Sequence, residues 1–236
     1  MSHSRIFFVL LTCLVAGFPG RTSAKDVGSL TRKVEVVTKA PQGEKETEMR
    51  VRDPVREGME VATGKRSGAE FAIGDAQGLV TMGPTSRFTF EEGLFDGSLL
   101  DRVRCRISFG RFWFWFAPPV SKPTVLGRHP REVVIRSGGE DIHLSGTAVF
   151  LRVERNGMTT LYVEQGTAVV GEPGEEVRVE PGQWTMFGPG LPPQPPAPID
   201  GHQTTEIFAP GVLEISPPAL LDLTSPRLDL PKSGVP

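Results

Sequence analysis

The stretch VFLRVERNGMTTLYV, residues 149–163, decides the fold class of this chain. Apolar residues alternate with other residues on both sides of its centre: Val149, Leu151 and Val153 before it, Leu161 and Val163 after it. Successive side chains of a strand point to opposite faces, so this period of two predicts two half-buried strands. Asn156-Gly157 between them is a hairpin signal, and a type I′ turn there requires a positive φ at both residues.

The same period of two extends outward from this hairpin, over residues 34–187. Apolar pairs two residues apart recur along the chain: Phe71 and Ile73, Phe88 and Phe90, Val133 and Ile135, Val177 and Val179. Turn residues separate the second-half strands: Gly146, Asn156, Gly157, Gly166, Pro181 and Gly182. Short strands at roughly 8–12-residue spacing predict an all-β domain, either a twisted β-sandwich or a β-roll, with hairpin and glycine turns.

Composition supports a folded domain and limits the classes of partner. Of 236 residues, 38% are hydrophobic and 23% charged, so a wholly disordered chain is not expected. The 27 glycines and 22 prolines argue against a helical bundle. The formal net charge of -2 gives no indication of a nucleic-acid partner.

The chain divides into four segments. Residues 1–24 have a positive start, an apolar core and a small-residue end, which predicts a signal peptide too short to span a membrane. Residues 25–49 are expected to hold an N-terminal strand and linker, and residues 50–187 the β domain. Residues 188–236 are Pro-rich and are expected to be largely irregular. Apolar clusters in this tail, such as Ile207-Phe208 and Leu220-Leu221, could instead dock as an added strand on the domain or on a partner.

Removal of the leader predicts a periplasmic or secreted protein with no membrane span. Cys105 is then the sole remaining cysteine, which excludes an intrachain disulfide. Its alternation with Val103 and Ile107 favours burial.

The sequence shows no catalytic constellation. It contains no HExxH, CxxC or GxSxG motif, and no histidine pair at a local ligand spacing. We therefore expect no enzyme, no catalytic residue, no cofactor and no metal. Carboxylates assembled in space into a hydrolase site are the less favoured alternative.

Two features remain as candidate partner-binding sites. Arg102, Arg104 and Arg106 place three guanidinium groups on one strand face, either to bind an anionic partner or as a solvated face balanced by nearby carboxylates. Residues 112–116 (FWFWF) are aromatic on both faces, with Trp113 and Trp115 on one side. Such a strand is either covered on both sides or offers one face to a partner, and exposed tryptophans could serve as a carbohydrate platform.

Five short motifs in order resemble the FecR domain family over about residues 50–187. They are Thr63-Gly64, Met82-Gly83-Pro84-Thr85-Ser86, Gly146-Thr147, the run Val163-Glu164-Gln165-Gly166, and Pro181-Gly182-Gln183. The resemblance implies a periplasmic all-β domain without catalytic residues. In the best-known members a transmembrane helix and a sigma-regulatory cytoplasmic segment precede this domain, and neither is seen here.

The sequence therefore predicts an exported, non-catalytic, FecR-type interaction domain. Its partner would be a protein or polymer of the cell envelope, with signalling as a possible role. The alternative is a module that binds polysaccharide or peptidoglycan.

Overall fold

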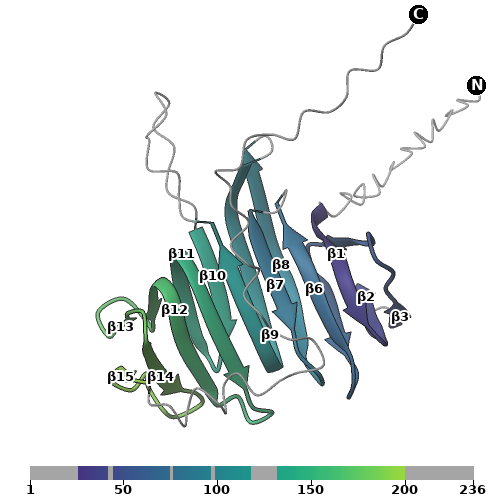
Figure 1. The fold of residues 1–236 in the computed structure, drawn as a ribbon. Coiled ribbons are helices and arrows are strands. Elements are labelled where there is room, and N and C mark those ends of the chain that lie inside the picture. Colours follow the sequence, from purple (N-terminus) through teal and green to yellow (C-terminus); the bar gives the residue numbers. More distant parts are fainter. Residues whose placement is uncertain (1–25, 42–44, 75–76, 97–98, 118–131, 200–236) are drawn as a thin grey trace, which may run out of the picture.

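The computed structural model describes residues 26–41, 45–74, 77–96, 99–117 and 132–199. Every regular element in these ranges is a strand, and the strands form one 15-stranded sheet (Figure 1). The predicted all-β class is therefore confirmed. The strands are β1 (Asp26–Val34), β2 (Val37–Pro41), β3 (Thr47–Glu48), β4 (Pro54–Arg56), β5 (Met59–Thr63), β6 (Gly68–Ile73), β7 (Gly78–Met82), β8 (Arg87–Asp96), β9 (Leu99–Phe116), β10 (Glu132–Ser137), β11 (Glu140–Val153), β12 (Thr159–Val170), β13 (Val177–Val179), β14 (Gln183–Phe187) and β15 (Ala197–Pro198).

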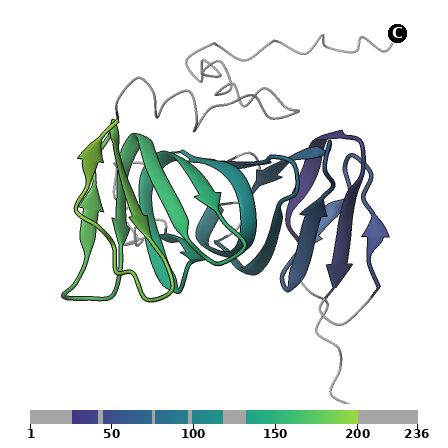
Figure 2. The same cartoon turned by 90° about the horizontal axis from the view of Figure 1, so that it is seen from below.

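The sheet folds over on itself into two facing layers, which makes the domain a β-roll (Figure 2). The first layer runs β3-β2-β5-β8, then the first half of β9, β10, the first half of β11, the second half of β12 and β13. The second layer runs β4-β1-β6-β7, then the second half of β9, the second half of β11, the first half of β12, β14 and β15. The long strands β9, β11 and β12 thus belong to both layers. All pairings are antiparallel except that of β9 with β10.

A glycine marks the point where each long strand passes from one layer to the other. Gly110 in β9, Gly146 in β11 and Gly166 in β12 all have a positive φ. At each glycine the positions that face inward shift by one residue, so inward-facing residues change between odd and even numbers. In β9 the buried residues are Val103 and Cys105 before the glycine, but Phe112 and Phe114 after it.

This change keeps apolar residues inside the roll on both sides of each bend. A one-residue slip reverses the faces of a strand, and a bulge at a glycine provides that slip while the strand turns. The space at Gly166 is also too small for a side chain, since an added Cβ would lie 2.4 Å from the carbonyl oxygen of Gly146.

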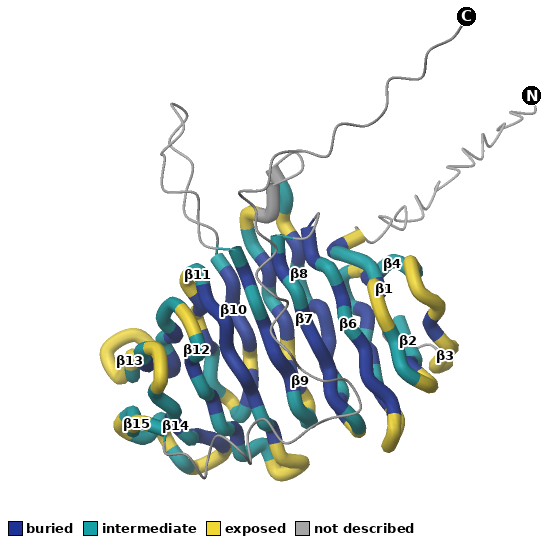
Figure 3. The backbone as a smooth tube through the Cα atoms, in the orientation of Figure 1, coloured by how far each residue is buried: buried dark blue, intermediate teal, exposed yellow. Residues whose placement is uncertain are grey.

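The main core lies between the two layers and is rich in phenylalanine. Phe88 of the first layer contacts Phe71 and Phe112 of the second, with ring centroids 5.9 and 5.8 Å apart. Cys105 is fully buried in this core, as its neighbours in the sequence predict. Buried residues follow the central strands, whereas exposed residues gather in the turns at the ends (Figure 3).

The Thr63-Gly64 and Gly83–Ser86 motifs contact each other where the chain passes from β7 to β8. The Thr63 hydroxyl donates to the Gly83 carbonyl over 2.7 Å and accepts from the Ser86 backbone N–H over 3.0 Å. The Thr85 N–H donates to the Gly64 carbonyl over 2.9 Å. These motifs therefore satisfy buried backbone groups at a corner of the roll, which is a structural role.

The turn at Asn156-Gly157 joins β11 and β12, but it is not the two-residue type I′ turn predicted. Gly157 has a φ of 87°, whereas Asn156 is not among the residues with a positive φ. The Glu154 N–H donates to the Met158 carbonyl, so three residues form the loop, and the Gly157 N–H donates back to Glu154. This pattern fits a type I turn closed by a left-handed glycine, which is another common hairpin connection.

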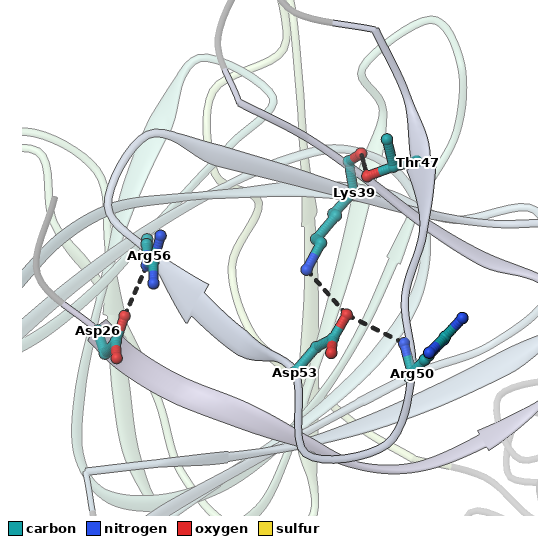
Figure 4. A network of polar contacts seen from close by, with 6 residues as sticks. All are labelled: Asp26, Lys39, Thr47, Arg50, Asp53 and Arg56. Carbon is teal, nitrogen blue, oxygen red and sulfur yellow. Dashed lines mark hydrogen bonds and ion pairs between the residues drawn. The ribbon is translucent and has the colours of Figure 1, made fainter.

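The sheet extends beyond the 50–187 range at both ends. β1 pairs with β6 and β2 with β5, so strands that precede residue 50 belong to the same roll, and β15 adds a short strand after residue 187. Polar contacts fasten the N-terminal edge (Figure 4): Asp53 accepts from Lys39 Nζ over 2.8 Å and from the Arg50 N–H over 3.1 Å. The expected leader, residues 1–24, and residues 200–236 of the tail lie outside the described residues.

Candidate functional site

The outer face of the first layer carries the arginine strand together with carboxylates from its neighbours. Arg102 contacts Glu132 of β10 over 2.6 Å and Glu92 of β8 over 3.9 Å. Arg106 contacts Glu91 of β8 over 3.0 Å. The structure thus places Arg102 and Arg106 in ion pairs within the sheet, so much of their charge is already balanced.

Arg104 and the neighbouring β10–β11 pair continue this charged face. Arg136 donates to Asp141 over 2.8 and 3.2 Å, and this hydrogen bond, with the charge of Arg136, lowers the pKa of Asp141. The charge of Arg104 lowers the pKa of Asp141 further. The Nε of Arg104 is itself buried without a hydrogen-bond partner. Exposed ion pairs contribute about 0–1 kcal/mol each, so the ion pairs of this face stabilise the roll only slightly.

The outer face of the second layer carries a row of four aromatic side chains, one on each of four neighbouring strands. Trp113 of β9 lies opposite Phe150 of β11, Phe150 opposite Tyr162 of β12, and Tyr162 opposite Trp184 of β14. We call these four residues the aromatic row. Directly opposed side chains in a sheet lie about 4.5–5.5 Å apart at Cβ, which is within contact distance for aromatic rings.

Further apolar side chains flank the aromatic row. Trp115 lies opposite Leu79 of β7 and Ala148 of β11. Trp113, Ala148 and Phe150 form a buried cluster separate from the main core, and Leu79, Trp115 and Tyr162 pack against it partly buried. The two tryptophans proposed from the sequence therefore lie side by side on one face, but Trp113 is buried whereas Trp115 is not.

One carboxylate and one unpaired N–H give the aromatic row polar character. The Trp113 indole N–H donates to Glu164 over 3.2 Å. Burial and, second, the charge of Glu164 raise the pKa of Tyr162. The Trp184 Nε1 is buried without a hydrogen-bond partner. Since a buried N–H without a partner is costly, a group that reaches the row could gain from accepting this hydrogen bond.

Sequence reasoning missed Phe150, Tyr162 and Trp184 as members of this site. Each is a single aromatic residue at an outward position of its own strand, and nothing local distinguishes it from an ordinary surface residue. The only signal was register: with β11 and β12 paired through their hairpin, Phe150 and Tyr162 fall opposite each other.

The described residues hold one thiol, Cys105, and one histidine, His143. They contain no group of three or more His, Cys, Asp or Glu side chains that could hold a metal ion. Burial raises the pKa of the Cys105 thiol, which keeps it protonated and unreactive. His143 is exposed on the first layer, and His129 and His202 lie outside the described residues. No helix in the part of the chain that is described has the length and apolar character needed to cross a membrane.

Comparisons with known proteins found matches among solved structures. No family model and no curated protein matches the chain. Two crystal structures, at 2.50 and 1.65 Å resolution, of a "putative anti-sigma factor" from Parabacteroides distasonis ATCC 8503 each match with a TM-score of 0.47 and 12% identity. They cover 62% of this chain, and the chain spans 62% of their length, slightly under two thirds. A likeness of this size assigns no function to the chain.

Proposed function

We propose that this protein is an exported, non-catalytic interaction domain of FecR type, which binds a protein of the cell envelope through the outer face of its second layer. Its activity is binding, and the resemblance to FecR domains adds signalling as the purpose of that binding. A periplasmic or secreted location is part of the same proposal.

The proposal rests on the chemical difference between the outer faces of the two layers. On the first layer, Arg102, Arg106 and Arg136 are paired with carboxylates of neighbouring strands, so much of the charge of this face is already balanced. On the second layer, Trp115, Tyr162 and Trp184 are partly exposed next to the buried rings of Trp113 and Phe150. Aromatic clusters are typical of the centres of protein interfaces, where tryptophan and tyrosine contribute much of the binding energy.

The FecR-like motifs support the family assignment through their position in the fold. Thr63-Gly64 and Gly83–Ser86 contact each other at one corner, Gly146 and Gly166 lie at the bends of β11 and β12, and Gly182 lies in the turn between β13 and β14. These residues therefore have structural roles at the corners, bends and turns of the roll. They do not define the binding face, which is formed by other residues.

Affinity purification of the full-length chain from envelope extracts tests the proposal. We compare the wild type with Trp115→Ala, Trp115→Phe and Arg106→Ala. A partner that co-purifies with the wild type and with Arg106→Ala, is lost in Trp115→Ala and is retained in part by Trp115→Phe supports it. A partner lost in Arg106→Ala and retained in Trp115→Ala moves the binding surface to the first layer and refutes the proposal.

A second candidate function is binding of polysaccharide or peptidoglycan, and the aromatic row is the observation that favours it. The partly exposed rings of Trp115, Tyr162 and Trp184 offer apolar surface on which sugar rings could stack. Retardation of the wild type in gels that contain soluble glycans, and loss of this retardation in Trp115→Ala, would select it. Equal mobility in gels with and without glycans would exclude it.

A further inference from the structure

Two side chains on the outer face of the second layer are as buried as residues of the core. Trp113 and Phe150 are each 2% exposed, although the main core lies on the other side of their strands. Side chains stand roughly perpendicular to a sheet, so neighbours in the same sheet cover their flanks and leave their tips open. The side chains that pack beside these rings, Leu79, Trp115 and Tyr162, are themselves only partly buried, so this face offers apolar surface on which further chain can pack.

We propose that the C-terminal segment of this chain, residues 200–236, docks on the aromatic row, with Ile207 and Phe208 as its first anchor. This inference goes beyond the proposed function, because it concerns the chain by itself and stands whether or not an envelope partner is found. A partner that binds the same face then has to displace the segment, which makes the segment a competitor for the site.

The point where the described chain ends supports this occupant. β15 is the last strand of the second layer, and its Ala197 lies opposite Trp184, the outermost member of the aromatic row. The Ile199 N–H then donates to the Gly182 carbonyl over 3.0 Å, which holds the start of the segment against β14. The segment therefore begins beside the row and on the same layer.

The length of the segment is sufficient to cross the row. Trp184 and Trp113 are separated by three strand spacings, or about 14 Å at ~4.8 Å each. From Ile199 to Ile207 the chain advances eight positions, which span about 26 Å when extended at ~3.3 Å per residue. Ile207 and Phe208 can thus reach any ring of the row.

The chemistry of the segment matches the face. Its apolar clusters, Ile207-Phe208 and Leu220-Leu221, would bury apolar surface against the rings, at about 25 cal/mol for each Å² removed from water. Any backbone carbonyl that passes over Trp184 could accept from its buried Nε1, which has no hydrogen-bond partner. The tail continues from β15, whose Ala197 lies opposite Trp184, so it can bring such a carbonyl to the indole.

The three tryptophans of the protein, Trp113, Trp115 and Trp184, all lie on this face. Their fluorescence therefore shows whether the face is covered or open to solvent. We compare acrylamide quenching of the full-length wild type with that of Ile207→Ser/Phe208→Ser. The proposal predicts a roughly twofold rise in the quenching constant and a red shift of the emission maximum. The matched control Leu228→Ser/Leu230→Ser, farther along the tail, is expected to quench like the wild type. Equal quenching in all three proteins, or an equal rise in both variants, would overturn the proposal.

A second readout separates the chain's own segment from a second copy and does not depend on loss of packing. A photo-crosslinking residue at position 208 should join the segment to peptides of β11 or β12 within the same chain, with a yield that is independent of protein concentration. Crosslinks that form only between two copies, and that vanish on dilution, would overturn the proposal. Loss of an envelope partner in the affinity purification would leave both of these readouts unchanged.

Discussion

The outer faces of the two layers are built largely by the same strands, yet their chemistry is opposite. β9 gives Arg102, Arg104 and Arg106 to the first layer and Trp113 and Trp115 to the second. β11 likewise gives Asp141 and His143 to one face and Phe150 to the other. A strand that passes through both layers can therefore carry a solvated, ion-paired face and an aromatic face in succession.

Three glycines at the bends of the long strands, Gly110, Gly146 and Gly166, therefore determine which residues face the core and which face outward. We call them the corner glycines. Without the one-residue slip at Gly110, the inward side of β9 would continue through Trp113 and Trp115, and the phenylalanines that follow would face out. The corner thus determines both which aromatic side chains fill the core and which form the candidate site.

Substitution of a corner glycine should have the largest effect, because it removes the basis of the difference between the faces. Gly166→Val places a side chain at a φ of 72° and against the Gly146 carbonyl, so we expect a loss of about 3–5 kcal/mol or failure to fold. Gly182→Ala, with a φ of 79° and open space around it, should lose only about 1–2 kcal/mol. Denaturant unfolding of both variants measures the difference, and equal losses would show that the corner tolerates a side chain.

Truncation of a ring in the aromatic row should cost more than removal of a charge from the first layer. Phe150→Ala is expected to lower the free energy of unfolding by about 3 kcal/mol, since a buried phenylalanine leaves a cavity. Arg106→Ala, which removes an exposed ion pair, should cost less than about 1 kcal/mol. If chemical denaturation gives similar losses of unfolding free energy for the two variants, the aromatic row does not stabilise the roll more than the charged face does.

The hairpins of the two layers provide a finer comparison. Gly157, between β11 and β12, has a φ of 87° and would place a Cβ 3.0 Å from the Pro189 side chain, whereas Gly139, between β10 and β11, has a φ of 94° and open space. We expect Gly157→Val to cost about 2–3 kcal/mol and Gly139→Val about 1–2 kcal/mol. Thermal unfolding of the two variants tests this order. An unchanged melting temperature for Gly157→Val would show that the turn at Gly157 does not need a glycine for stability.

The smallest effect is the pH dependence of the charged face. Arg136 lowers the pKa of Asp141 in the folded state, so the pair contributes stability above the unfolded pKa, near 3.9. That contribution disappears as the pH falls through the lower, folded-state pKa. Asp141→Asn should therefore cost less than about 1 kcal/mol at pH 7 and a smaller amount at pH 2, as measured by denaturation at the two pH values. A variant that is equally destabilised at both would rule out the ion pair as the cause.

The sequence predicted the parts of this structure that depend on local pattern. Alternation along residues 149–163 predicts two strands, and the neighbours of Cys105 predict its burial, because side-chain direction in a strand follows from position alone. The exact turn at Asn156 was not predictable in this way, since the same dipeptide fits both two- and three-residue loops.

The candidate site was only half predictable, because it depends on register between distant strands. Trp113 and Trp115 are noticeable in the FWFWF run, but Trp184 is 71 positions after Trp113 (184 minus 113) and joins it only through β11 and β12. The ion pairs of Arg102 and Arg106 likewise combine β8, β9 and β10. No local pattern contains such non-local pairings.

Site-specific photo-crosslinking in the intact cell envelope tests whether a partner protein binds the outer face of the second layer. A photoreactive residue replaces Leu79, beside Trp115 on the second layer, or the exposed His143 on the first layer. We expect a discrete adduct of higher mass from position 79 that saturates with expression level, and none from position 143. A discrete adduct from position 143 alone would contradict it, because the partner would then bind the charged face.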